Sequence, residues 1–131
     1  MERKPKILIV EDDRDLVEMY ETKFKMEGFD VLKVDNGVPA TPMAKSEKPD
    51  LILLDIVMPE MDGFEVLKKL KASDSTKGIP VILLTNLGQE ADVKKGMDMG
   101  AVDYLIKANF TPNEVVEKAR KTMGRGEAVA V

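Results

Sequence analysis

The stretch Leu51–Gly63, with the sequence LILLDIVMPEMDG, places a single carboxylate at the end of a fully apolar run. Leu51–Leu54 contains no polar side chain, which is typical of a central strand of a parallel sheet that is covered on both faces. Asp55 follows at once, and a loop containing proline and glycine comes next. A charge at the edge of a core is costly unless it is paired, so Asp55 is a candidate functional residue.

Short apolar runs and amphipathic stretches alternate along the whole chain, and this pattern predicts strands alternating with helices. Strands are expected at Lys6–Val10, Phe29–Val34, Leu51–Leu54, Pro80–Leu84 and Tyr104–Ile106. Helices are expected from a cap at Asp13 or Asp15 to Glu27, as a short or irregular segment near Pro42, from Asp62-Gly63 to Ala72, from Gln89 to Met99, and from Pro112 to Met123. Parallel neighbours require crossover connections, so the pattern predicts an α/β fold with a parallel sheet.

The chain length of 131 residues fits one domain with a single core. We expect this domain to span residues 1–123, and we expect residues 124–131 to form a disordered C-terminal tail. No second domain, repeat or low-complexity tract is visible.

Composition excludes several functional classes. The chain has no cysteine and no histidine, which rules out thiolate metal sites, cysteine nucleophiles and imidazole catalysis. The net charge of −4 argues against a nucleic-acid partner, which calls for a basic surface. No apolar run is long enough to span a bilayer, so we expect no membrane partner and a cytoplasmic location.

Polar side chains follow four of the predicted strands, at the point where each strand ends. They are Glu11 and Asp12 after the first strand, Asp55 after the third, Thr85 after the fourth and Lys107 after the fifth. In open parallel sheets, binding sites lie beyond the carboxyl ends of the strands. We therefore expect these side chains to converge.

Such a cluster fits phosphoryl chemistry. Carboxylates without histidine or cysteine favour Mg²⁺, with Mn²⁺ as an alternative, because these ions prefer hard oxygen ligands. Lys107 and Thr85 are suited to holding phosphoryl oxygens, as a point charge and as a hydrogen-bond donor. Asp55 is then a candidate nucleophile that forms an acyl phosphate.

The order of these motifs resembles the receiver domain of two-component response regulators, and in particular the stand-alone, chemotaxis-regulator-like members. The resemblance covers about residues 6–123 and rests on Glu11-Asp12, on Asp55 in DIVMPEMDG, on Thr85 and on the run Tyr104–Lys107. It implies a flavodoxin-like, doubly wound, five-stranded parallel sheet of strand order 2-1-3-4-5 with five helices.

The resemblance also implies a phosphoacceptor and a metal site. Asp55 would accept a phosphoryl group from a histidine kinase or a histidine phosphotransfer protein. Mg²⁺ would be held by Asp12, by Asp55 and by the main-chain carbonyl of Val57, with Glu11 acting through water.

A switch is implied as well. Thr85 and Tyr104 match the family's switch pair, in which the hydroxyl moves to the phosphoryl group and the ring turns inward. Lys107 would bind a phosphoryl oxygen.

The expected function is therefore a stand-alone, phosphorylation-switched signalling module that acts by altered binding of an unidentified downstream protein. It would not be an enzyme beyond promoting its own phosphotransfer and dephosphorylation, and it would be a monomer or a weak, phosphorylation-dependent dimer. One alternative is a Mg²⁺-dependent aspartyl-phosphate phosphohydrolase, which calls for a second carboxylate where Val57 stands. The other is a non-phosphorylated adaptor with the receiver fold.

Two positions depart from the family pattern, and two more bear on the lifetime of an acyl phosphate. Ala108 follows Lys107 where proline is usual, and we expect a trans peptide bond there because a cis bond before alanine costs about 3 to 4 kcal/mol. Asn86 stands where a smaller residue is usual and would narrow access to the phosphoryl group. Val57 and Leu87 are both apolar, which predicts slow self-dephosphorylation.

Overall fold

Parallel strands form the centre of the computed structural model, which describes residues 4–130. The strands are β1 (Lys6–Val10), β2 (Asp30–Val34), β3 (Leu51–Leu54), β4 (Val81–Thr85) and β5 (Asp103–Ile106). They form one five-stranded sheet in the order β2-β1-β3-β4-β5, and every neighbouring pair is parallel. This is the predicted flavodoxin-like order.

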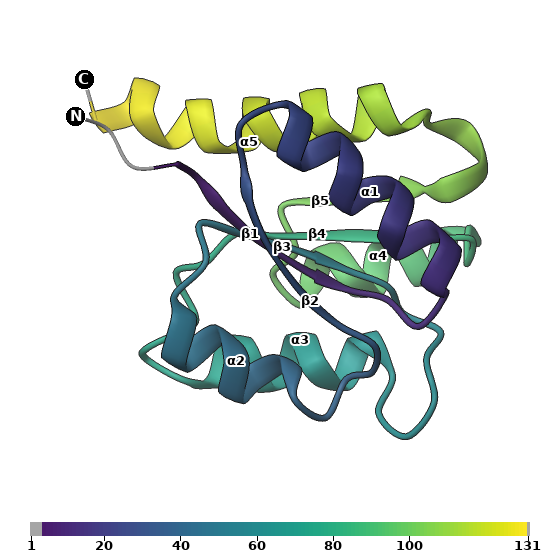
Figure 1. The fold of residues 1–131 in the computed structure, drawn as a ribbon. Coiled ribbons are helices and arrows are strands. Elements are labelled where there is room, and N and C mark those ends of the chain that lie inside the picture. The colour runs from purple at the N-terminus through teal and green to yellow at the C-terminus, as the bar shows by residue number, and fades with distance from the viewer. Residues whose placement is uncertain (1–3, 131) are drawn as a thin grey trace.

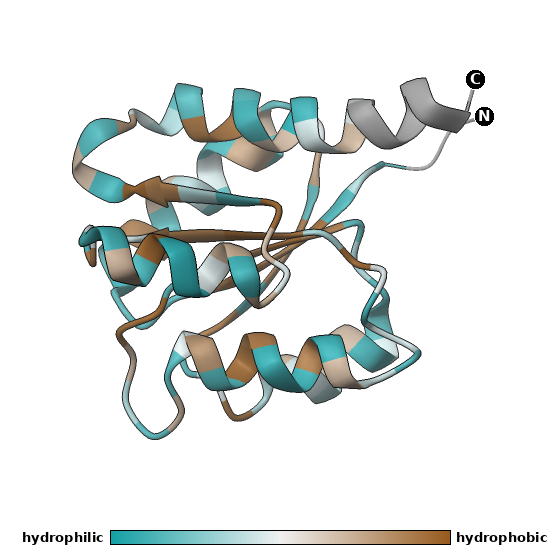
Figure 2. Ribbon diagram, turned by 180° about the vertical axis from the view of Figure 1, so that it is seen from behind, coloured by the Kyte–Doolittle hydropathy of each residue, from teal (hydrophilic) through white to brown (hydrophobic). Residues whose placement is uncertain are grey.

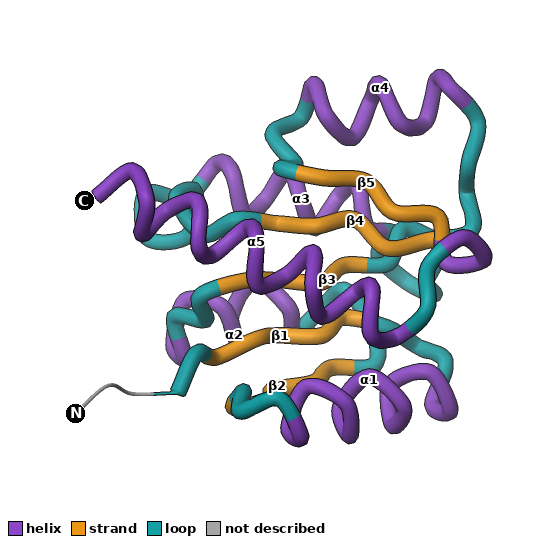
Figure 3. The backbone as a smooth tube through the Cα atoms, turned by 90° about the horizontal axis from the view of Figure 1, so that it is seen from above, coloured by secondary structure: helices purple, strands orange, loops and turns teal. Residues whose placement is uncertain are grey.

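Helices cover both faces of the sheet (Figure 1). They are α1 (Arg14–Met26), α2 (Ala40–Glu47), α3 (Gly63–Ala72), α4 (Glu90–Asp98) and α5 (Pro112–Ala130), with a short 3-10 helix η1 (Lys107–Asn109) after β5. Helices α1 and α5 lie on one face, α2 and α3 lie on the other, and α4 lies beside β5 (Figures 1 and 3).

The period of two along each strand divides the core into two layers. In β1, Ile7 and Ile9 pack toward α1 and α5, whereas Leu8 and Val10 pack toward α2 and α3. The central strands β3 and β4 are accordingly apolar and buried along nearly their whole length, whereas the edge strand β2 exposes Asp30 and Lys33 (Figure 2). Because every neighbouring pair is parallel, the carboxyl ends of the strands lie at one edge of the sheet.

Capping residues in the sequence were sufficient to predict where three of the helices begin. The Asp13 carboxylate caps α1 by accepting hydrogen bonds from the amides of Asp15 and Leu16. Asp62 caps α3. At the start of α5, Thr111 and Glu114 form the reciprocal bonds of a capping box. These predicted starts are confirmed.

Other boundaries differ from the expectation. Helix α2 begins at Ala40, before Pro42. Proline is tolerated there because amides in the first helical turn have no partner within the helix. The predicted strands from Phe29, Pro80 and Tyr104 each begin one residue away from the observed start.

Helix α5 continues to Ala130, whereas the sequence predicted its end near Met123 and a disordered tail from residue 124. Glycine within a helix costs only about 1 kcal/mol relative to alanine, so Gly124 need not end the helix. Residues 1–3 and 131 of the predicted domain and tail lie outside the described residues. Among the described residues, no helix combines the length and apolar character needed to cross a membrane.

Candidate functional site

Asp55 lies directly after β3, at the edge where the strands end. Its side chain is nearly buried, with 5% of the residue exposed. Oδ1 accepts hydrogen bonds from the amides of Ile56 and Val57, at 2.7 and 3.3 Å. Oδ2 accepts a hydrogen bond from Nζ of Lys107 at 3.0 Å. The carboxylate is therefore fixed in orientation by its own loop and by the cation of Lys107, which opens η1 directly after β5.

The loop after Asp55 closes tightly on the start of α3. A Cβ atom on Gly63 would lie 2.2 Å from the main-chain oxygen of Asp55, so only glycine fits this approach. Within the loop, the amide of Met61 donates to the carbonyl of Pro59 at 2.8 Å around Glu60, which has a φ of 67°. This three-residue turn reverses the chain. The proline and glycine of the motif thus shape the loop around the carboxylate.

Glu11 and Asp12 bring two more carboxylates to the same edge. Glu11 is 4% exposed, accepts a hydrogen bond from the Asp13 amide at 3.0 Å and contacts Nζ of Lys107 directly. Asp12 is exposed. Carboxylate oxygens of Glu11, Asp12 and Asp55 all lie within 4.8 Å of one another. This donor set of hard oxygens fits a divalent cation that also keeps water ligands.

Burial and the neighbouring charges shift the pKa values of Glu11 and Lys107. Desolvation raises the pKa of the Glu11 carboxyl from its ordinary 4.5 to about 7, although hydrogen bonds from Lys107 and the Asp13 amide oppose the rise. Burial alone would lower the pKa of Lys107, but the hydrogen bonds and charges of Glu11 and Asp55 outweigh it and the pKa is raised. Lys107 is therefore a permanent cation between two carboxyl groups.

Thr85 and Tyr104 contact the β4–α4 loop instead of the acidic cluster. Thr85 is fully buried at the end of β4, and its hydroxyl oxygen accepts a hydrogen bond from the Leu87 amide at 3.3 Å. The half-buried Tyr104 donates a hydrogen bond from its hydroxyl to the Leu87 carbonyl. Both hydroxyl side chains therefore hold the same peptide segment.

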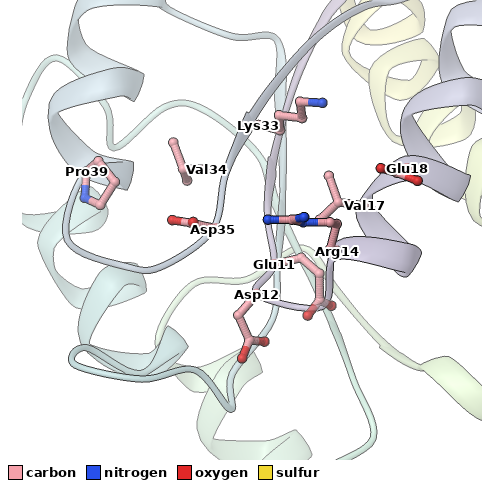
Figure 4. Close-up of a pocket in the computed structure, with 9 residues that line it drawn as sticks. All are labelled: Glu11, Asp12, Arg14, Val17, Glu18, Lys33, Val34, Asp35 and Pro39. Atoms are coloured by element: carbon pink, nitrogen blue, oxygen red, sulfur yellow. The ribbon is translucent and has the colours of Figure 1, made fainter.

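A hollow of about 590 Å³ adjoins the cluster between the carboxyl ends of β1 and β2 (Figure 4). Glu11 and Asp12 belong to its lining, together with Arg14 from α1 and Lys33 from β2. The residues that line this hollow come from separate elements, so local sequence patterns could not predict the hollow.

The structure adds contacts that the sequence did not indicate. The resemblance implied a role for Glu11 toward the metal through water, and the structure adds a direct contact of Glu11 with Lys107. Leu87 joins Thr85 to Tyr104 through its main chain, which no side-chain pattern could indicate. No described peptide bond is cis, so Lys107–Ala108 is trans as expected, and Ala108 lies in η1.

Comparison with known proteins gives a consistent match. The family described as the response regulator receiver domain matches residues 7–120. The DNA-binding dual master transcriptional regulator RpaA of Synechocystis sp. is 37% identical over 125 residues, covering 95% of this chain and 52% of its own length. The alkaline phosphatase synthesis transcriptional regulatory protein PhoP of Bacillus subtilis is 36% identical over 125 residues, covering 95% and 51%. The chain thus spans about half the length of these curated relatives.

Solved structures agree in fold over nearly the whole length. Chemotaxis protein CheY4 of Vibrio cholerae superposes with a TM-score of 0.84 at 26% identity, covering 90% of this chain and 98% of that one. The CheY-like response regulator receiver domain protein of Methanospirillum hungatei gives a TM-score of 0.88 at 25% identity, covering 95% and 98%.

Proposed function

The chain belongs to the response regulator receiver domain family, and on this premise we propose that it is a phosphorylation-switched signalling module with Asp55 as phosphoacceptor. The observation that carries the proposal is the convergence of Asp55, Glu11 and Asp12 from two strand ends with Lys107 from a third. We also propose that residues 1–123 form one receiver domain. Whether this domain acts alone stays a prediction, as do the cytoplasmic location, the oligomeric state and the absence of a nucleic-acid partner.

The proposed donor is a histidine kinase or a histidine phosphotransfer protein. A carboxylate oxygen of Asp55 attacks phosphorus, the P–N bond of the donor's phosphohistidine breaks, and the released imidazole nitrogen takes up a proton. The product is an acyl phosphate on Asp55. The described residues thus supply the nucleophile, and the partner supplies the phosphoryl group.

Lys107 is suited to stabilise the transferred group. Its ammonium already lies 3.0 Å from Asp55 Oδ2, so a phosphoryl group on this carboxylate would come within its reach. The Thr85 hydroxyl accepts the Leu87 amide hydrogen through a lone pair. Its own proton is therefore available to donate to a phosphoryl oxygen.

The residues present fit a divalent cation. We propose that Asp12 and Asp55 bind Mg²⁺, or Mn²⁺, together with the main-chain carbonyl of Val57, and that Glu11 acts through water. When bound, the cation would neutralise charge that develops on the phosphoryl oxygens. Asp12 is the exposed member of the cluster, so it can bind a cation without breaking a contact to Lys107.

Signalling would follow from the β4–α4 loop. Because Thr85 and Tyr104 both bind Leu87, movement of the Thr85 hydroxyl toward a phosphoryl group would release one side of this peptide. The loop and Tyr104 would then rearrange and change the surface that a downstream protein binds. The chain's own chemistry would be limited to its phosphotransfer and dephosphorylation.

Incubation with acetyl phosphate and Mg²⁺, followed by intact-mass analysis, tests the phosphoacceptor. We expect one added phosphoryl group in the wild-type protein and none in Asp55→Asn. Asp62→Asn is the matched control, because asparagine caps a helix as well as aspartate does and α3 keeps its start. No added mass would overturn the proposal in favour of an adaptor, and sustained release of phosphate would favour a phosphohydrolase.

Calorimetric titration with Mg²⁺ tests the metal site. Asp12→Asn should weaken binding by about tenfold or more, the loss seen when groups around a metal are removed. Asp13→Asn is the control, since Asp13 caps α1 and asparagine can replace it there. Equal affinities in the two variants would contradict the assignment of Asp12.

A further inference from the structure

Helix α4 is held to the sheet by few side chains. Gly96 is its single buried residue, and its N-terminal cap residue Gln89 forms no side-chain hydrogen bond to the helix. By comparison, α3 buries Phe64 and several aliphatic residues. The position of α4 therefore depends on a small number of individual contacts.

Gly96 brings the backbone of α4 directly against the switch tyrosine. A Cβ atom at this position would lie 2.5 Å from Cδ1 of Leu83 and 3.1 Å from Cδ2 of Tyr104. The helix thus lies on the Tyr104 ring, whose hydroxyl binds the Leu87 carbonyl. Any displacement of α4 changes the space available to this ring.

The neighbouring residue Lys95 connects α4 with α3. Its Nζ lies 4.2 Å from the centroid of the Phe64 ring, within the range of a cation–π contact. Phe64 is only 8% exposed and lies in the first turn of α3. No described acidic residue forms an ion pair with Lys95, so this ring is its main partner.

Phe64 is itself fixed relative to Asp55. It follows Gly63, whose backbone packs against the Asp55 carbonyl. Two consecutive residues of α4 therefore connect the two parts of the site. Lys95 contacts Phe64, which follows the phosphoacceptor loop, and Gly96 packs against Tyr104.

We infer that Lys95 is a positioning residue for the switch: its contact with Phe64 holds α4 over Tyr104 and so favours the ring position in which the hydroxyl binds Leu87. Removing the cation frees α4 to move from the ring. The geometry stands by itself, and only its regulatory meaning rests on the proposed function.

The chain offers a direct probe, because it contains two tyrosines and no tryptophan. In a Tyr20→Phe background, Tyr104 is the sole tyrosine and can be labelled with 3-fluorotyrosine. The ¹⁹F resonance then reports the ring environment without any phosphodonor. Lys95→Met removes the charge and keeps an apolar stem, and Lys95→Arg keeps a cation.

Lys94→Met is the matched control, since Lys94 lies on the same helix but pairs with Asp98 at 2.7 Å. We expect Lys95→Met to change the ratio of Tyr104 states by about two- to fivefold, the range of an exposed cation–π contact. Lys95→Arg should keep the wild-type spectrum, and Phe64→Leu should reproduce the effect of Lys95→Met. Circular dichroism verifies that each variant is folded.

A shift in Lys95→Met that is no larger than in Lys94→Met would overturn the inference, as would additive effects of Lys95→Met and Phe64→Leu in the double variant. Intact mass after acetyl phosphate treatment is measured on the same samples. An unmodified Asp55 would contradict the proposed function while leaving the Tyr104 result to stand, so the two failures are distinguishable.

Discussion

Tyr104 donates a hydrogen bond from its hydroxyl to the main-chain carbonyl of Leu87, and the amide of the same residue donates to Thr85. One residue of the β4–α4 loop therefore connects two side chains that stand on neighbouring strands. The loop can move only if at least one of these bonds breaks, which links Thr85 with Tyr104 through the main chain of Leu87.

Tyr104→Phe should lower the free energy of unfolding by about 0.5 to 1.5 kcal/mol, the net contribution of a hydrogen bond. We expect the lower half of this range because Tyr104 is half-buried and water can replace its hydroxyl. Urea unfolding measures the change. Tyr20→Phe is the control, since the Tyr20 hydroxyl binds no described residue, and an equal loss in both variants would contradict the role of the Leu87 bond.

Gly63→Ala should destabilise the fold by about 3 kcal/mol or more, the upper range for overpacking. The added Cβ would lie 2.2 Å from the Asp55 carbonyl oxygen, and main-chain atoms cannot yield as a side chain can. Thermal unfolding of Gly78→Ala gives the comparison, because a Cβ there meets no atom within 4 Å. Similar stabilities of the two variants would contradict the tight closure of the loop.

Lys107→Met should lower the free energy of unfolding by about 1 to 3 kcal/mol when no divalent cation is present, because Glu11 and Asp55 lose their charged hydrogen-bond partner. Added Mg²⁺ should reduce this difference by compensating the same carboxylates. Denaturant titrations with and without Mg²⁺ measure both effects. Lys77→Met removes an exposed pair with Asp74 and should cost at most about 1 kcal/mol under either condition.

Local signals explain which parts of this fold could be predicted. The apolar run of β3, the cap residue Asp62 and the capping box at Thr111 act within a few residues of one another, so their positions follow from the sequence alone. The start of α2 could be placed only near Pro42, because proline often marks a helix boundary, although the first turn tolerates proline and the helix begins at Ala40.

In the candidate site, too, some features could be predicted from the sequence and others could not. The strand-end rule predicted that Glu11, Asp55 and Lys107 would share one edge, and the described contacts join them. The Leu87 bonds depend on main-chain atoms, and the Lys95–Phe64 contact depends on how α4 packs beside α3. No pattern of residue types in the sequence indicates the Leu87 bonds or the Lys95–Phe64 contact, so both required the tertiary structure.

An acyl phosphate formed on Asp55, as proposed, should decay slowly, because the apolar side chain of Val57 cannot bind an attacking water. Val57 is 62% exposed, and its amide donates a hydrogen bond to Asp55 Oδ1 at 3.3 Å. An apolar group there offers neither a hydrogen-bond acceptor nor a base to the water. Leu87, the second apolar residue near the site, is half-buried and equally unable to do so.

Val57→Asn should therefore shorten the lifetime of the phosphorylated protein several-fold by orienting water toward phosphorus. Intact mass against time, after removal of acetyl phosphate with Mg²⁺ retained, measures the decay. Val38→Asn changes another exposed valine away from Asp55 and should leave the rate unchanged. Loss of the phosphoryl group from the wild-type protein within seconds at neutral pH would refute slow decay, and equal rates for the two asparagine variants would show that position 57 does not control the water.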